Sequence, residues 1–452
     1  MTVSAAEEIE SSRFGLFHRL IIGLIGLTVV FDGYDTFVPA YVISAVAGPK
    51  GAWHLSHTQA GFLVSSGLFG FMIGALVHGS IADRIGRRAT LLGGMWISGV
   101  FSLATAIFAN DDGTFLILRV LTGLGLGTLL PLCTTYITEF SPARGRNAFV
   151  VWGAAVGWAS GAIVASLVGI WLTPRFGWHA LFWFASLSLI VAAISQVWLP
   201  ESPRFLALRA RFGELALLLA RIRPERAEIY RGATFVIPAV LAGSGSPLAL
   251  LAPAFRRNTI IIWVCAFFVL FDIYGLGGWL PPVMMTRGET PSASFGYGAL
   301  LQIASLLGAF ACGAIADRRG GRRMPLAVWW LLGAASVLLL AVVNTHVTNA
   351  LLIFAAGFFV IGGQFILNNF TAVAYPTELR ATGVGMELGI GRVGGILGPY
   401  IGGAIQDAFG GANGFFAAMA LASLLSALAI WFSRPVAGDI SAAPTMPQDA
   451  VA

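Results

Sequence analysis

Twelve runs of apolar residues, each long enough to cross a lipid bilayer, recur along the chain. A transmembrane helix needs about 20 such residues because the hydrocarbon core is about 30 Å thick. The composition agrees, since 57% of the residues are hydrophobic and 11% are charged, against roughly 25% charged in soluble domains. We therefore predict an all-α integral membrane protein with twelve transmembrane helices. These cover residues 19–45, 57–82, 90–109, 115–140, 148–172, 179–199, 259–284, 294–316, 324–343, 350–373, 383–404 and 414–432.

A long polar stretch divides the predicted helices into two sets of six, and three short motifs recur in both sets. The segment 79–88 returns as 313–323, Thr138-Glu139-Phe140 returns as Thr377-Glu378-Leu379, and Phe31-Asp32-Gly33-Tyr34 returns as Phe271-Asp272-Ile273-Tyr274. The nearly constant offset indicates two pseudo-symmetric six-helix bundles that arose by duplication. Such halves usually enclose a binding site near the bilayer midplane. The predicted domains are an N-terminal bundle (1–199), a cytoplasmic linker of one or two helices (200–257), a C-terminal bundle (258–434) and a disordered cytoplasmic tail (435–452).

Basic residues gather on one side of the predicted membrane, in the loops that follow the second, fourth, sixth, eighth and tenth spans. By the positive-inside rule, both termini and the linker are expected to be cytoplasmic. The net charge of +6 is then a matter of topology, and we expect no nucleic-acid partner. Residues 1–12 are polar and acidic and no cleavage site is visible, so we expect the first span to be retained. The three cysteines are scattered in apolar runs, which predicts neither a disulfide nor a metal site.

Two carboxylates, Asp32 and Asp35, interrupt the first apolar run. A charge near the bilayer midplane costs at least about 2.5–3.5 kcal/mol, so a function or a partner must offset it. Their spacing of three residues places both on one helix face. The second half keeps Asp272 in place of Asp32 but has Gly275 in place of Asp35. Asp35 is therefore the stronger functional candidate, whereas Asp32 and Asp272 can share a structural role.

Arg119 in the fourth span is expected at a depth that Asp32 or Asp35 can reach. An arginine facing lipid is costly, so it should face the interior and a carboxylate. Pairing favours the ionised carboxylate and burial favours the protonated one, and a cavity that opens and closes can shift this balance. We predict proton coupling at Asp35, Asp32 and Arg119. A purely structural ion pair is the alternative.

Arg392 in the eleventh span is flanked by glycines and lies about nine residues from the predicted end of the span, a depth of roughly 13 Å at 1.5 Å per residue. A buried guanidinium there suits a bidentate substrate carboxylate, although a protein carboxylate is the alternative partner. Neutral polar groups and aromatic faces on the neighbouring spans can complete such a site. The other residues predicted to contact substrate are Tyr34, Phe37, Asp272, Tyr274, Gln302, Gln364, Asn368 and Asn369.

The loop between the second and third spans carries a glycine, an Asp-Arg pair, a second glycine and two arginines, and the loop after the eighth span repeats this pattern. An aspartate at such a helix end can pair with an arginine or with a helix N-terminus, which makes a latch for conformational change. Topology anchoring is the simpler alternative. The predicted gating residues are Gly79, Asp83, Arg84, Gly86, Arg87, Arg88, Glu139, Arg144, Asp317, Arg318, Glu378 and Arg380. The pattern resembles the signature of the major facilitator superfamily, which implies the major facilitator fold.

Further segments narrow the resemblance to the aromatic acid:proton symporters of that superfamily. These are Asp32-Gly33-Tyr34-Asp35-Thr36, Glu139-Phe140-Ser141-Pro142, the run 375–383 and Gly391-Arg392-Val393-Gly394-Gly395. The resemblance implies import of benzoate-like or hydroxybenzoate-like anions with protons across a bacterial inner membrane. The family's sensitive positions correspond to Asp32, Asp35, Asp83 and Arg392. Segment 200–204, Pro-Glu-Ser-Pro-Arg, is more similar to sugar porters and niacin transporters, so another organic acid, niacin or a sugar-like solute is the alternative substrate.

Other classes of protein fit the sequence less well. A membrane receptor that binds without transporting would be expected to carry signalling modules, and an integral-membrane enzyme would need a nucleophile motif, a phosphate-binding loop or a metal-ligand cluster. We therefore expect a non-enzyme that works as a monomer. It would use the proton as coupling ion and would need no other cofactor and no metal.

Overall fold

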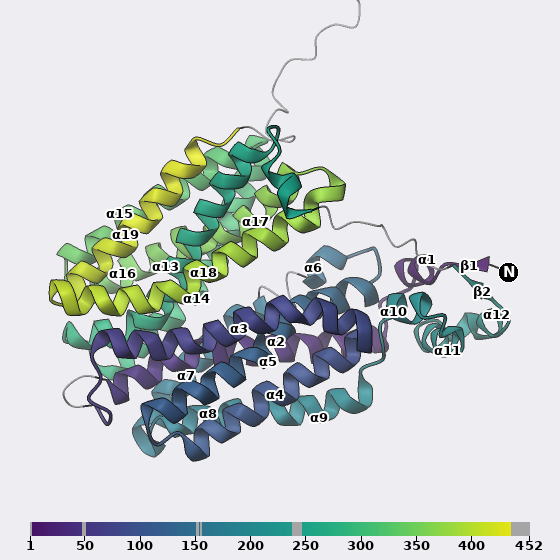
Figure 1. The fold of residues 1–452 in the computed structure, drawn as a ribbon, viewed down its shortest axis with the longest axis horizontal. Coiled ribbons are helices and arrows are strands. Elements are labelled where there is room, and N and C mark those ends of the chain that lie inside the picture. Colours follow the sequence, from purple (N-terminus) through teal and green to yellow (C-terminus); the bar gives the residue numbers. More distant parts are fainter. Residues whose placement is uncertain (1, 48–50, 151–152, 154–155, 237–245, 435–452) are drawn as a thin grey trace, which may run out of the picture. The chain divides into compact units, whose positions relative to one another are not determined.

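The computed structural model describes residues 2–47, 51–150, 153, 156–236 and 246–434 (Figure 1). Within these residues, eleven helices are long and apolar enough to cross a membrane. The described chain is mainly α-helical, and its strands are two two-residue segments that pair with each other. The predicted all-α membrane architecture is therefore confirmed. The predicted tail, 435–452, lies outside the described residues.

The elements of the first half and linker run in a simple order. They are β1 (Thr2–Val3), α1 (Ala5–Glu10), α2 (Leu16–Val46), α3 (His57–Ile85), α4 (Arg87–Phe108), α5 (Asp112–Phe140), α6 (Arg146–Val150), α7 (Gly157–Phe176), α8 (His179–Ala185), α9 (Ser188–Trp198), α10 (Pro203–Leu208), α11 (Phe212–Ile222), the 3₁₀ turn η2 (Pro224–Arg226), α12 (Ala227–Arg231) and β2 (Thr234–Phe235). The linker thus contains several short helices, where the sequence predicted one or two.

The second half contains six predicted spans and one short entry turn. Its elements are the 3₁₀ turn η3 (Pro247–Leu251), α13 (Arg256–Thr286), α14 (Pro291–Arg319), α15 (Arg323–Val342), α16 (His346–Ala356), the π-helical turn η4 (Gly357–Ile361), α17 (Gly362–Ala374), α18 (Thr377–Phe409) and α19 (Ala412–Trp431). The tenth predicted span is therefore interrupted by η4. α13 continues through Pro281 and Pro282 without a break.

The eleventh predicted span corresponds to α18, which is not among the eleven apolar helices. This helix is 33 residues long, ample to cross a bilayer. Its many glycines and the charged residues Glu387 and Arg392 lower its mean hydropathy. The predicted eleventh span is therefore present as a helix, and its polar residues belong to the candidate site described below.

The chain divides into two compact units. Unit 1 contains Met1–Leu241 and Gly278–Gln302, and unit 2 contains Ala242–Gly277 and Ile303–Ala452. The linker up to Leu241 and the segment around the α13–α14 loop therefore group with the first half. The predicted domain boundaries stay a prediction, because this grouping follows contacts and not the duplication.

Glycines allow two helices to cross closely in unit 1. A Cβ at Gly33 on α2 would clash with the Trp158 carbonyl of α7, and a Cβ at Gly161 on α7 would clash with the Val30 carbonyl of α2. Small residues at such crossings let backbones approach. Gly161 therefore serves close helix packing. In unit 2, Gly394 of α18 meets the backbone of α13 in the same way.

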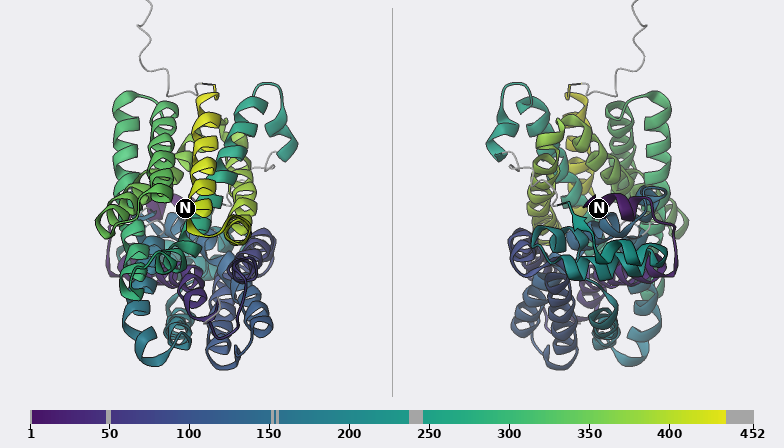
Figure 2. Two further views of the ribbon diagram at one scale, coloured as in Figure 1. Left: turned by 90° about the vertical axis from the view of Figure 1, so that its left-hand side faces the viewer. Right: turned by 90° about the vertical axis from the view of Figure 1, so that its right-hand side faces the viewer.

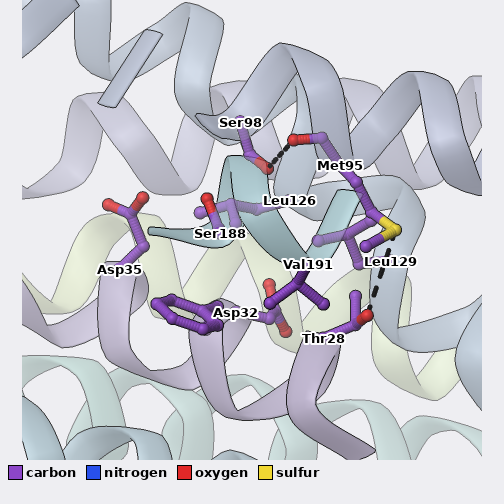
Figure 3. Close-up of a pocket in the computed structure, with 10 residues that line it drawn as sticks. Thr28, Asp32, Asp35, Met95, Ser98, Leu126, Leu129, Ser188 and Val191 are labelled. Carbon is purple, nitrogen blue, oxygen red and sulfur yellow. Dashed lines mark hydrogen bonds between the residues drawn. The ribbon is translucent and has the colours of Figure 1, made fainter. Parts of the chain in front are cut away.

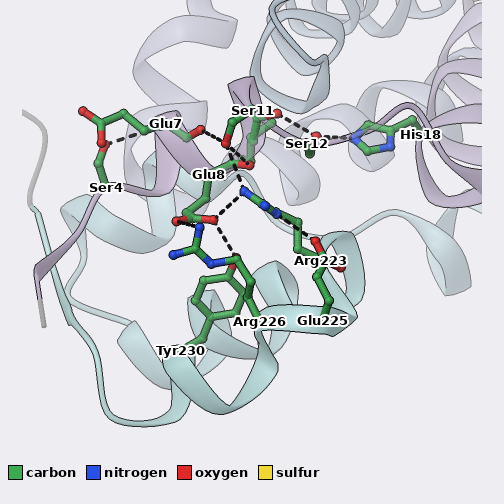
Figure 4. Close-up of polar contacts among 11 residues, drawn as sticks. Ser4, Glu7, Glu8, Ser11, Ser12, His18, Arg223, Glu225, Arg226 and Tyr230 are labelled. Carbon is green, nitrogen blue, oxygen red and sulfur yellow. Dashed lines mark hydrogen bonds and ion pairs between the residues drawn. The ribbon is translucent and has the colours of Figure 1, made fainter.

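A polar cluster joins the N-terminal segment to the linker in unit 1 (Figure 4). Arg223 Nη1 lies 2.9 Å from Glu8 Oε2, and Arg226 Nη1 lies 3.2 Å from Glu8 Oε1. The Tyr230 hydroxyl donates to Glu8 Oε2 at 2.8 Å, and burial together with this hydrogen bond raises the pKa of Tyr230 above its ordinary value. The right-hand view of Figure 2 shows α1 beside the linker helices. Pairing of β1 with β2 completes the attachment.

We predict that Glu8→Gln loosens this attachment locally. Hydrogen bonds to a charged group contribute about 1.5–3 kcal/mol, so amide hydrogen exchange in residues 2–12 should accelerate by at least about tenfold. Glu7→Gln is the matched control, because the Glu7 carboxylate is exposed and takes no part in the cluster. Equal exchange rates in the two variants would contradict a stabilising role for the Glu8 cluster.

Candidate functional site

The buried ion pair of unit 1 joins Asp35 on α2 to Arg119 on α5. Arg119 Nη1 donates to Asp35 Oδ1 at 2.5 Å, and Arg119 Nη2 donates to the Asp35 carbonyl oxygen at 2.8 Å. Ser102 of α4 donates to the other carboxylate oxygen. The Arg119 side chain is 2% exposed and its guanidinium lies 5.5 Å from the Phe182 ring centroid. The predicted pairing of Arg119 with a first-span carboxylate is therefore confirmed, and the partner is Asp35.

Asp32 lies one turn before Asp35 and is fully buried. Both aspartates line a small cavity with room for about one water molecule, and Figure 3 shows them side by side on α2. The remaining lining comes from α4, α5 and α9, with Ser98 and Ser188 adding polar groups. The prediction that Asp32 and Asp35 share one face of the first span is confirmed. Arg119, however, directs its hydrogen bonds to Asp35, so the two carboxylates have different surroundings.

Tyr34 and Phe37, predicted to contact substrate, are engaged within unit 1. The Tyr34 hydroxyl donates to the Leu181 carbonyl at 2.8 Å, and its ring centroid lies 5.1 Å from that of Phe184. Phe37 packs edge-on against Trp158 at 5.0 Å. We leave both residues out of the proposed site, because their polar and aromatic groups already serve helix packing.

The central feature of unit 2 is Arg392, the sixteenth of the 33 residues of α18. Its Nη1 donates to the Tyr274 hydroxyl of α13 at 2.5 Å, and its guanidinium carbon lies 5.8 Å from the Tyr274 ring centroid. Gly385 and Gly389 share the helix face of Arg392 by their spacing, and a Cβ at either would meet nothing within 4 Å. The structure therefore brings together Arg392 and Tyr274 beside an open glycine face.

Asp272, a further predicted substrate contact, instead faces α19. It is fully buried, and the Ser423 hydroxyl donates to its Oδ2 at 2.5 Å. Its counterpart Asp32 likewise lies near a serine, Ser188, of the sixth span of its own half. This arrangement favours the shared structural role considered for the two aspartates, and we leave Asp272 out of the proposed site.

The predicted amide contacts lie in different places. Gln364 Nε2 donates to Asn368 Oδ1 at 2.7 Å on α17, whereas Asn369 is exposed on the same helix. Gln302 is buried on α14 and groups with unit 1. Gln364 and Asn368 both adjoin Glu387 of α18, which the sequence reasoning missed. A lone carboxylate in a predicted span was the signal that could have found it.

The loop between α3 and α4 is held by the segment that follows the sixth span. Glu201 Oε1 accepts the backbone N–H groups of Arg87 and Arg88, each at 3.0 Å, at the start of α4. A carboxylate suits this position because a helix N-terminus carries partial positive charge. Gly86 has a φ of 105°, and a Cβ there would clash with the Glu201 carboxylate. Arg87 also pairs with Glu139.

Glu201, and not Asp83, occupies the N-terminus of α4. Asp83 is exposed and interacts electrostatically with Arg87, so the latch at Asp83 stays a prediction. Arg209 of the linker donates to the Asp83 and Arg84 carbonyl oxygens. Close packing at Gly79 is wrong, since a Cβ there would meet nothing within 4 Å. The other predicted gating residues are exposed in this structure, namely Arg144, Asp317, Arg318, Glu378 and Arg380.

Apolar spans in two repeated halves, with buried charges in the middle of the spans, define a membrane transporter of the secondary type. The Major Facilitator Superfamily profile matches residues 20–386. The chain belongs to this superfamily, as its loop motifs predicted.

Similar proteins agree with this family. The chain is 34% identical to a gallate transporter of Pseudomonas putida, with 95% of this chain and 94% of the relative covered. It is 33% identical to a 4-hydroxybenzoate transporter of Acinetobacter baylyi (85% and 84% covered) and 31% identical to a niacin transporter of the same organism (87% and 88%). A D-xylose–proton symporter structure superposes with a TM-score of 0.69 at 19% identity, over 93% of this chain and 98% of that one. These relatives are named transporters, which supports the prediction that the chain is not an enzyme.

We predict strong energetic coupling between Asp35 and Arg119. Asp35→Asn leaves a buried guanidinium without its anion, which should cost about 3–5 kcal/mol and lower the melting temperature of the purified protein. Asp35→Asn/Arg119→Gln removes both charges and should be more stable than Asp35→Asn alone, a non-additivity that a double-mutant cycle measures. Asp112→Asn, at an exposed position on α5, is the control. Additive losses would show that the pair is not energetically coupled.

Proposed function

We propose that this protein imports small aromatic carboxylates together with protons by alternating access. Three features support the proposal. Relatives over most of the chain are named gallate, 4-hydroxybenzoate and benzoate transporters. Arg392 supplies a guanidinium for the carboxylate, and the Asp35–Arg119 pair supplies a titratable group inside the membrane region.

The observation that carries the substrate class is the setting of Arg392. A guanidinium in the middle of a membrane helix is costly unless it meets an anion or hydrogen-bond acceptors. Tyr274 accepts one hydrogen bond, and the planar fork matches a carboxylate in bidentate geometry. Gly385 and Gly389 leave space on the same face of α18, which suits a flat ring beside the bound carboxylate.

Proton coupling is proposed at Asp35. When ionised, Asp35 accepts hydrogen bonds from Arg119 and Ser102. Proton binding neutralises the carboxylate and removes its attraction for the guanidinium, so the contact between α2 and α5 weakens. A helix contact that is made in one protonation state and broken in the other can couple proton movement to a change of conformation. Asp32 adds a second carboxyl group to the same cavity.

The setting of the transporter is part of the proposal. The bacterial relatives support an inner membrane location, and the distribution of basic loops supports both termini in the cytoplasm. We propose that the protein works as a monomer, with the proton as coupling ion and no further cofactor. Niacin is the second candidate substrate, because a relative at 31% identity is named a niacin transporter and niacin offers the same carboxylate to Arg392.

We predict that proteoliposomes take up labelled 4-hydroxybenzoate under an inward proton gradient, and that gallate and benzoate compete more strongly than niacin or xylose. Arg392→Lys keeps the charge but loses the planar fork, so the KM should rise about tenfold or more, as expected for loss of about 1.5–3 kcal/mol.

Arg256→Lys is the matched control, because Arg256 is exposed at the start of α13. Competition by xylose alone would reject the aromatic-acid substrate class. Competition by niacin alone would favour the second candidate. An unchanged KM in Arg392→Lys would remove Arg392 from the binding site.

A further inference from the structure

Glu387 is a buried carboxyl group that the proposed mechanism does not yet use. It lies on α18, ten residues after the helix start at Thr377, and has no exposed surface. An ionised carboxylate at this depth costs several kcal/mol unless it is compensated. Five residues separate it from Arg392, which places the two side chains on different faces of the helix. Groups other than Arg392 must therefore offset the cost of burying Glu387.

The groups around Glu387 within the described part of unit 2 are neutral hydrogen-bonding side chains. Gln364 Nε2 lies 3.5 Å from Glu387 Oε1, and the Asn368 amide lies 2.7 Å from the same oxygen. Thr371 is the third polar neighbour. The titratable groups that face it are Cys265 of α13 and Tyr375 after α17. Among the described residues, the side chains that act on Glu387 are Thr371 and Gln364, which are neutral.

The Asn368 amide can satisfy Glu387 in two ways. With Asn368 Oδ1 toward Glu387, two acceptor oxygens face each other at 2.7 Å, a distance that requires a proton between them. Glu387 then donates its proton to Asn368 Oδ1, which also accepts from Gln364 at 2.7 Å. With the amide turned by half a rotation, Asn368 Nδ2 donates to an ionised Glu387. Gln364 must then turn its own amide as well, because its Nε2 lies 2.7 Å from the same Asn368 atom. The two states differ by one proton and two amide rotations.

Spare acceptors surround the same position. Glu387 Oε2 and Gln364 Oε1 are buried without a hydrogen-bond partner in the described residues. A proton on Glu387 supplies a donor where acceptors are in excess. The π-helical turn η4 ends directly before α17, one residue before Gly362 and three before Gln364. Such turns are frequent at functional sites because they mark a change of helix register.

From this geometry we propose that Glu387 is a second proton-binding site, located in unit 2, whose proton is exchanged during transport. The carboxylate takes up one proton from water to form the carboxylic acid and returns it to water on the other side, so no other reactant is needed. Asp35 in unit 1 and Glu387 in unit 2 then each carry one proton. The transport step rests on the proposed proton coupling, whereas proton binding by Glu387 can be measured without transport.

Infrared difference spectroscopy of the purified protein tests proton binding directly. The wild type should show the carbonyl stretch of a buried carboxylic acid that disappears on raising the pH and is absent in Glu387→Gln. Asn368→Ala keeps the carboxyl group but removes its partner, so the stretch should shift in frequency. Glu228→Gln, on the exposed surface of α12, is the matched control and should leave the spectrum unchanged. A Glu387→Gln spectrum identical to wild type at every pH would overturn the proposal.

The proton-to-substrate ratio tests the transport step in the same variants. Under opposing gradients in proteoliposomes, the ratio should fall by about one in Glu387→Gln and stay unchanged in Glu228→Gln. An unchanged ratio in Glu387→Gln, with the infrared band lost, would overturn the claim that the proton is transported. Uptake by the wild type that ignores the proton gradient would reject the proposed function, and the infrared result would still decide whether Glu387 binds a proton.

Discussion

The ion pair between Asp35 and Arg119 sets the arrangement of the helices around it in unit 1. Both groups lie among apolar spans, where each alone would cost at least about 2.5–3.5 kcal/mol. The guanidinium holds the carboxylate and the backbone of α2, while Ser102 of α4 satisfies the other carboxylate oxygen. Three helices are thereby joined at one titratable point. On the opposite side of α2, Gly33 of α2 and Gly161 of α7 allow the two helices to pack closely. The helix that carries Asp35 is therefore held on both sides.

Unit 2 repeats the scaffold but places its charges differently. Gly394 packs α18 against α13 as Gly161 packs α7 against α2. Asp272 accepts a hydrogen bond from Ser423 of the sixth span of its half, and Asp32 lines a cavity together with Ser188 of the sixth span of its own half. These shared features belong to the duplicated fold. Arg392 and Glu387 lie outside the matched motifs, and Asp35 has Gly275 at its position in the second half. The residues that break the repeat are the ones to which we assign transport.

Much of this structure could be predicted from the sequence, for physical reasons that differ between residues. The long apolar runs predict the spans, and the rule that a membrane arginine must face an acceptor predicts Arg119 beside Asp32 or Asp35. The same rule applies to Glu387, because a lone carboxylate in a span also needs a hydrogen-bonding partner. The sequence could not predict which neighbours Tyr34 and Asp272 face. Every face of a helix in a membrane bundle is apolar, so the period of apolar residues does not distinguish the face toward lipid from the face toward protein. The capping of α4 by Glu201 could not be predicted either. It joins residues that lie 113 or 114 positions apart, and a sequence motif describes only neighbouring residues.

The most direct measurement compares two modes of transport in Asp35→Asn. Exchange of labelled for unlabelled substrate across proteoliposomes needs the conformational change but no net proton movement, whereas accumulation against a gradient needs both. If Asp35 couples the proton, the variant should exchange substrate and lose proton-driven accumulation. The Asp35→Asn/Arg119→Gln variant, which removes the charges as a pair, should behave in the same way if it folds. Accumulation at the wild-type level in Asp35→Asn would contradict proton coupling at this ion pair.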